Sequence, residues 1–184
     1  MTKGPLVNSR RVTLHEVSGS RDFVVECTVT RLPDGLELAF EVRGDLGVLY
    51  PGGLPPMRVR AGRDLWKRTC LETFFFAAGS TRYVELNWNV LGEHALLGFA
   101  AYRRPADVPL GFEVLAVERS VGPSRLASRL TLGLPAGCRY LLSPTAVLCP
   151  TGAAPLHFAF AHAGRPDFHA REVVEAAGTL FELC

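Results

Sequence analysis

Residues 25–43 have the sequence VECTVTRLPDGLELAFEVR, and this stretch decides the fold class. On both sides of its centre, apolar and polar side chains alternate with a period of two, which is typical of β-strands with one buried face. The central Leu32-Pro33-Asp34-Gly35 combines a proline that presets φ with a glycine that accepts positive φ. The stretch therefore predicts two antiparallel strands joined by a tight turn.

The rest of the chain predicts more strands and little helix. Pro144, Pro150 and Pro155 interrupt the uncharged stretch 140–164, which favours strands and turns over a membrane-spanning helix. Residues 172–177 favour one or two helical turns. We therefore predict one all-β domain over residues 1–184, an antiparallel β-sandwich of jelly-roll or immunoglobulin-like outline. Further strands are predicted at residues 69–76, 82–90, 94–102, 112–119, 125–134, 140–148, 157–161 and 179–183.

Composition and charge argue against several classes of partner. The 184 residues are 48% hydrophobic and 21% charged, with a formal net charge of +2, as in an ordinary folded domain. Basic residues are scattered, with no run longer than the pairs 10–11 and 103–104, so no nucleic-acid partner is predicted. Residues 1–17 lack the apolar core of a secretory signal, and five cysteines without a CxxC spacing favour free thiols. A cytoplasmic location without membrane contact is predicted, and a protein partner is left open.

Residues 83–89, YVELNWN, carry a row of hydrogen-bonding groups on one strand face. The apolar face, with Val84, Leu86 and Trp88, is predicted to face the core. The opposite face is either a solvated outer surface or a platform for a polar ligand, since fixed donors and acceptors beside an aromatic ring suit such recognition. The row consists of Tyr83, Glu85, Asn87 and Asn89.

Glu72 is a carboxylate on a strand whose two faces are both apolar, which predicts a central strand. A buried carboxylate is costly unless it is paired or hydrogen-bonded. Two interpretations remain open. Either an arginine such as Arg63, Arg68 or Arg82 pairs with Glu72, or Glu72 lines a site.

Several motifs together resemble the bacterial DOMON-like domain family, which is related to the family 9 carbohydrate-binding modules. The resemblance spans positions 63–169 and implies a β-sandwich. It also implies a binding module, because Trp66 and Glu72 have the spacing of a tryptophan and a glutamate that bind sugar in those modules. The motifs are RDLWKRTCLETF at 63–74, YVELN at 83–87, YR at 102–103, HFAFAH at 157–162 and RPDFH at 165–169.

The sequence departs from the sugar-binding modules in ways that bear on the ligand. Their second stacking tryptophan has no counterpart, so Phe158 or Phe168 would have to serve, and Glu85 stands where the modules offer an arginine. Members of the wider DOMON group bind haem b through methionine and histidine. Met57 and His162 are the residues available here for that alternative.

Enzyme and metal-site signatures are absent from the sequence. It has no GxSxG elbow, no Walker loop and no GxGxxG, and its C-terminal histidines match no zinc spacing. A Glu72–Glu85 pair for glycoside hydrolysis is the catalytic alternative. We predict no catalysis, no metal and no cofactor. The predicted function is binding of a small polar ligand or carbohydrate; the alternatives are a haem-b electron-transfer domain and a structural or protein-interaction module. The predicted ligand-binding residues are Trp66, Glu72, Tyr83, Glu85, Asn87 and Phe168.

Overall fold

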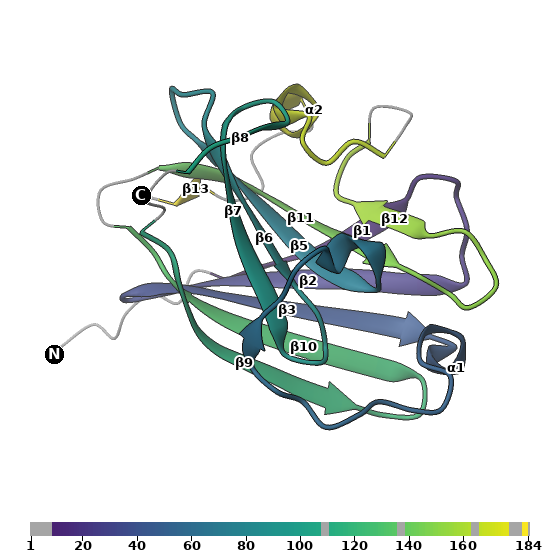
Figure 1. Ribbon diagram of the computed structural model, residues 1–184. Coiled ribbons are helices and arrows are strands. Elements are labelled where there is room, and N and C mark those ends of the chain that lie inside the picture. The colour runs from purple at the N-terminus through teal and green to yellow at the C-terminus, as the bar shows by residue number, and fades with distance from the viewer. Residues whose placement is uncertain (1–8, 108–110, 136–138, 163–165, 177–181, 184) are drawn as a thin grey trace, which may run out of the picture.

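Antiparallel strands dominate the computed structural model, which describes residues 9–107, 111–135, 139–162, 166–176 and 182–183 (Figure 1). Among these residues the helices are short: α1 (Leu46–Leu49), the 3₁₀ turn η1 (Leu65–Lys67) and α2 (Arg171–Ala176). The strands are β1 (Ser9–Glu16), β2 (Phe23–Leu32), β3 (Gly35–Gly44), β4 (Arg60–Ala61), β5 (Cys70–Ala77), β6 (Tyr83–Trp88), β7 (Glu93–Ala101), β8 (Arg104–Pro105), β9 (Glu113–Val121), β10 (Arg125–Gly133), β11 (Tyr140–Leu148), β12 (Leu156–Ala159) and β13 (Glu182–Leu183).

The main strands form one hydrogen-bonded path in the order β4-β7-β6-β5-β11-β12-β1-β2-β3-β10-β9. Strand β1 joins the two halves, because most of it pairs with β2 while His15 and Glu16 pair with β12. The path curls so that the β2-β3-β10-β9 half lies across the β7-β6-β5-β11 half (Figure 1). The all-β prediction is confirmed. The architecture is a curled open sheet rather than two unconnected sheets, which is a coarser description than the predicted jelly-roll sandwich.

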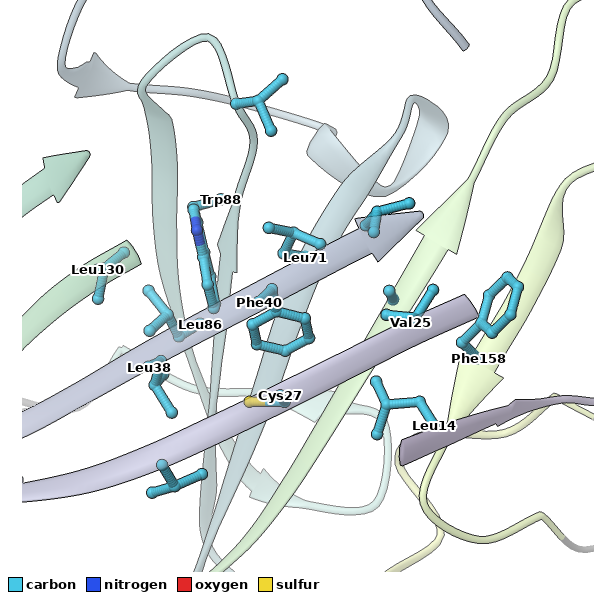
Figure 2. Packing of buried hydrophobic residues seen from close by; sticks show 14 of the residues in the cluster. Leu14, Val25, Cys27, Leu38, Phe40, Leu71, Leu86, Trp88, Leu130 and Phe158 are labelled. Atoms are coloured by element: carbon cyan, nitrogen blue, oxygen red, sulfur yellow. The ribbon is translucent and has the colours of Figure 1, made fainter. Parts of the chain in front are cut away.

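The core fills the space between the two halves of the curled sheet. Figure 2 shows side chains from β2, β3, β5, β6 and β10 meeting there. Phe40 of β3 meets Trp88 of β6 edge to face, with ring centroids 5.1 Å apart, and the indole N–H donates to Ser128 Oγ of β10 at 3.2 Å. The predicted core face of β6, with Val84, Leu86 and Trp88, is therefore confirmed.

The predicted hairpin is present, but its glycine has a different role from the one predicted. Strands β2 and β3 pair in register, with Leu32 opposite Gly35 across the turn. Gly35 does not adopt positive φ. Instead, a Cβ placed on it would lie 2.2 Å from the carbonyl oxygen of Leu132 on β10. Close approach of the β10 backbone therefore requires glycine here.

The other predicted strands within the described residues match observed strands to within two residues at each end. Strand β1 was not predicted, because only Val12 and Leu14 give its sequence an apolar alternation. The predicted strand 179–183 lies mostly outside the described residues, with β13 at its end. The predicted helical turns at 172–177 correspond to α2, and residue 177 lies outside the description.

The structure also bears on the predictions about the cysteines and about a membrane-spanning helix. Cys27, Cys70 and Cys149 are free thiols, while Cys138 and Cys184 lie outside the described residues. In the described part of the chain, no helix has both the length and the apolar character needed to span a bilayer.

The close approach at Gly35 gives a stability prediction. Gly35→Ala is expected to lower the free energy of unfolding by about 2–4 kcal/mol, because rigid backbone must move to admit the methyl group. Gly133→Ala is the matched control: Gly133 lies directly opposite Gly35 in the register, and its Cβ would make only ordinary contacts, the nearest at 3.6 Å. Urea denaturation measures both variants, and equal stability of the two would contradict the prediction.

Candidate functional site

Strand register places the candidate residues on the outer face of the β7-β6-β5-β11 half. Phe74 of β5 pairs with Glu85 of β6, and Glu85 pairs in turn with Leu97 of β7. Two residues before Phe74 on β5, Glu72 pairs with Asn87 on one side and with Thr145 of β11 on the other. Since alternate residues of a strand share a face, these side chains all lie opposite the main core.

A cavity of about 400 Å³ opens on this outer face. Strand residues form its floor, while η1 and the segment 166–169 contribute the rim. Its volume falls in the range of small-molecule sites. The lining residues are Trp66, Glu72, Phe74, Glu85, Leu97, Phe99, Arg103, Val147, His157, Pro166, Phe168 and His169.

Four of the six predicted ligand-binding residues meet in this cavity. Glu72 and Glu85 come from neighbouring strands, and Trp66 and Phe168 come from the rim. Trp66 is 53% exposed, which leaves much of its indole open to solvent. The ammonium of Lys67 lies 5.2 Å from the centroid of the indole ring. The other two predicted residues, Tyr83 and Asn87, support the floor from the same strand face.

Glu72 is buried, and no basic side chain in the described part of the chain pairs with it. Its Oε2 accepts a hydrogen bond from Thr145 Oγ1 at 3.4 Å, and among the described residues nothing donates to its Oε1. Burial, reinforced by the nearby charge of Glu85, raises the pKa of Glu72 to about 8. None of the three arginines named for Glu72, all within the described residues, pairs with it: Arg63 and Arg82 do not act on its carboxyl group, and Arg68 lies 3.1 Å from Glu93 instead. Glu72 therefore lines the cavity as a carboxylic acid at neutral pH.

Glu85 is held by the next residue on its strand face. Asn87 Nδ2 donates to Glu85 Oε1 at 2.7 Å. Burial raises the pKa of Glu85, and the Asn87 hydrogen bond and the charge of Arg103 oppose that rise. Because Asn87 directs its amide toward Glu85, its Oδ1 faces elsewhere, buried and without a donor among the described residues.

The hydrogen bonds around Tyr83 favour one tautomer of His169. The backbone N–H of Arg103 donates to Tyr83 Oη at 3.0 Å, so the phenol proton is free to bond His169 Nδ1, 2.7 Å away. His169 then carries its own proton on Nε2, which lies 3.8 Å from Glu85 Oε2. Burial and the charge of Arg103 lower the pKa of His169 to about 4. A neutral imidazole therefore stands beside Glu85.

Arg103 is tied down at the rim by Tyr102 and Asp167. Its guanidinium donates to Asp167 Oδ1 at 3.1 Å and to Tyr102 Oη at 3.3 Å. Burial tends to raise the pKa of Asp167, but the hydrogen bonds from Tyr102 and Arg103 outweigh it and lower that pKa. Asp167 Oδ1 also accepts from the backbone N–H of His169, which anchors the rim segment.

The fourth member of the predicted polar row has a structural role instead. Asn89 donates to Glu93 Oε2 at 2.9 Å, and its Oδ1 accepts from the backbone N–H groups of Leu91 and Glu93. Asn89 thus closes the turn between β6 and β7. Glu93 also pairs with Arg60 at 2.5 Å.

The residues named for haem have separate surroundings. Met57 packs against the main core, facing Gly92 at the β6–β7 turn. His162 donates from Nε2 to the carbonyl of His15 at 2.6 Å, and its ring lies 6.3 Å from that of Phe168. Within the described residues, no cluster of histidine, cysteine or carboxylate side chains suits a metal ion. Phe158 is buried in the main core, so of the two stacking candidates only Phe168 lies at the cavity.

Sequence reasoning missed part of the cavity wall. Phe74 shares strand parity with Glu72, and that signal was sufficient to place it. Phe99 follows from the pairing of β7 with β6, which the sequence does not give. His157 and His169 lie in two motifs of the resemblance, HFAFAH and RPDFH, but the sequence does not show that these segments reach the cavity.

Comparisons with known proteins support the fold. No family model matches the sequence, and no curated protein matches it. A crystal structure from Bacteroides uniformis ATCC 8492, described as "a putative carbohydrate-binding protein", matches with a TM-score of 0.59 and 14% identity. The match covers 91% of this chain and 84% of that chain. The red fluorescent protein lanRFPdam overlaps with a TM-score of only 0.16, too low to indicate a shared fold.

The pKa of Glu72 predicts how stability depends on pH. Its folded-state value, about 8, lies above the ordinary 4.5, so the unfolded chain ionises first and stability falls as pH rises from about 4.5 to about 8. Glu72→Gln lacks this loss. Each pH unit corresponds to about 1.4 kcal/mol, so the variant should gain a few kcal/mol over wild type across this window. His169 is present in both proteins and cancels in the comparison.

Urea denaturation between about pH 4 and about pH 9 measures this difference. Glu118→Gln, at a side chain that is 67% exposed on β9, controls for loss of one carboxylate. A constant offset between wild type and Glu72→Gln at every pH would contradict the prediction.

The Tyr83 hydrogen bond makes a second prediction about the site. Wild-type His169 is expected as the Nε2–H tautomer, detected by its imidazole ¹⁵N chemical shifts. Tyr83→Phe removes the donor to Nδ1, so both tautomers should become populated. Tyr50→Phe, at a tyrosine that packs against the main core, should leave the His169 shifts unchanged. An Nδ1–H tautomer in the wild type would contradict the assignment.

Proposed function

We propose that this chain is a non-catalytic module that binds a small polar ligand, with carbohydrate as the leading class. One observation carries the proposal: Trp66, Glu72, Glu85 and Phe168 come from four separate segments and line one cavity. An open aromatic ring beside hydrogen-bonding carboxyl groups suits a ring with one apolar face and several hydroxyls.

The two parts of the cavity suggest a division of roles. Glu72 and Glu85 lie on paired strands, so their positions are set by the sheet and they would fix the hydroxyls of a ligand. Trp66 lies on the short turn η1 and would stack on the apolar face of a sugar ring. Phe168, partly buried against Phe74, would close the opposite side, with the two ring centroids 6.4 Å apart.

The finer family assignment is part of this proposal. The motif resemblance to DOMON-like domains and family 9 modules, the sandwich outline it implies and the likeness to the Bacteroides uniformis protein agree on a binding role. The location in the cytoplasm and the absence of a cofactor remain predictions. Haem binding is less favoured than sugar binding, because Met57 and His162 contact different parts of the fold.

A ligand screen tests the proposal. Purified protein is titrated with mono- and oligosaccharides and with haem, following Trp emission and melting temperature, since a ligand of the native state raises the latter. Trp88 is buried in the core, so a spectral change should come from Trp66. Trp66→Ala is expected to weaken affinity for any sugar that binds by about tenfold or more, and to leave stability within about 0.5 kcal/mol of wild type.

Leu115→Ala is the matched control, because Leu115 is 56% exposed on β9, in the other half of the sheet. It should leave both affinity and stability unchanged. Unchanged sugar affinity in Trp66→Ala would argue against the proposed site. A response to haem alone would favour the electron-transfer alternative, and silence throughout would favour an interaction module.

A further inference from the structure

Two buried side-chain oxygens beside the cavity lack hydrogen-bond partners among the described residues. They are Oε1 of Glu72 and Oδ1 of Asn87, and neither has a partner among the described residues. Glu72 and Asn87 are direct cross-strand neighbours on the same sheet face, and Glu85 lies two residues from Asn87 on that face. Leaving a buried acceptor unpaired costs about 1–3 kcal/mol, so a ligand that supplies donors here would recover that energy.

The same region has carboxyl groups in excess of available cations. Arg103, the cation among the lining residues, is 3.1 Å from Asp167 and is shared with that carboxylate. Burial is the main reason why the pKa values of His157 and His169 are lowered. Both rings are therefore neutral at physiological pH. Among the residues that the structure describes, neither Glu72 nor Glu85 therefore has a dedicated positive partner.

We propose that the ligand of this cavity carries a primary ammonium group, which binds at Glu72 and Glu85 beside Asn87. An ammonium has three donors and no acceptor, and it matches the cluster of acceptors that Glu72, once ionised, forms with Glu85 and Asn87. A neutral hydroxyl would satisfy that cluster only in part. Among sugars, this chemistry selects an amino sugar over its neutral counterpart. The inference rests on the proposed function, since it names the ligand class of the same site.

The aromatic wall fits the same charge. The rings of Phe74 and Phe99 lie beside the carboxyl groups in the cavity, and those of Trp66 and Phe168 lie at its rim. Ring faces attract a cation, and the attraction strengthens where water is excluded. Carboxyl groups among aromatic rings are unfavourable for an anion and favourable for a cation.

Binding of a cation should displace the proton of Glu72. The pKa of about 8 keeps this group protonated in the free protein at neutral pH, and an adjacent ammonium favours the carboxylate. The groups that face Glu72 are Glu85 from β6, Thr145 from β11 and Cys70 on its own strand, with Cys149 beyond the end of β11. Glu85 raises the pKa of Glu72, while the hydrogen bonds of Thr145 and Cys70 lower it, so none of these groups replaces a bound cation.

The test compares matched pairs that differ in one amine. The pairs are D-glucosamine with D-glucose, D-galactosamine with D-galactose, and ethanolamine with ethylene glycol, each titrated calorimetrically at about pH 6.5, where the amines are protonated. At least one amine is expected to bind about tenfold more tightly than its neutral partner. Repeating the titration in buffers of different ionisation enthalpy should reveal release of close to one proton per amine bound.

Glu72→Gln keeps the size of the side chain and removes its charge. It should abolish proton release and reduce the preference for the amine to about threefold or less, while Glu118→Gln should behave as wild type. Proton release by the wild type tests the proposal even if the variant folds poorly. Equal or tighter binding of the neutral partners would overturn the ammonium inference and leave the proposed function standing. Silence of every amine would also overturn it, and silence of the wider sugar screen as well would remove the proposed function.

Discussion

Burial of both faces of strand β5 is the constraint on which the rest of this structure depends. One face packs Leu71 and Phe75 into the main core. The other holds Phe74 and Phe76, which a second cluster covers with Tyr83, Phe99 and Val174 of α2. That cover ends before Glu72, where the cavity begins. A central strand therefore carries a carboxyl group at the edge of its own apolar cover, and this placement raises the pKa of Glu72.

Charge is distributed very differently over the two outer faces of the curled sheet. On the β2-β3-β10 half, Glu26 and Glu41 are paired with arginines from neighbouring strands, among them Arg125, which lies 2.5 Å from Glu41. Such exposed pairs contribute little stability but leave no charge unmatched. On the β5-β6 half, Glu72 and Glu85 are buried, and the described residues supply no cation dedicated to either of them. Arginines are abundant in this chain, so the contrast supports the proposal that the ligand binds on the β5-β6 face.

The sequence predicted the strands and one face of the site, because both depend on local alternation. Parity alone placed Glu85 and Asn87 opposite Trp88. The resemblance to sugar-binding modules implied Trp66 and Glu72, which line the cavity together with Glu85. The sequence could not predict the features that depend on which strands are neighbours and on where the connecting segments pack. The carbonyl of Leu132 that excludes a side chain at Gly35, and the imidazole of His169 beside Glu85, come from segments distant in the chain. No local pattern encodes those meetings.

The cavity has a floor of paired strands and a rim of loop segments, and this difference affects the free energy of binding in the proposed function. Its floor belongs to paired strands whose positions are fixed by the fold, so the cost of desolvating Glu72 and Asn87 is met during folding rather than on association. A ligand that satisfies them regains that cost without ordering the protein further. Its rim, with Trp66 on a short turn and Phe168 on a connecting segment, can vary without disturbing the sheet. In the proposed binding mode, affinity for a polar group would be set by the strands, whereas the shape of the ligand accepted would be set by the rim.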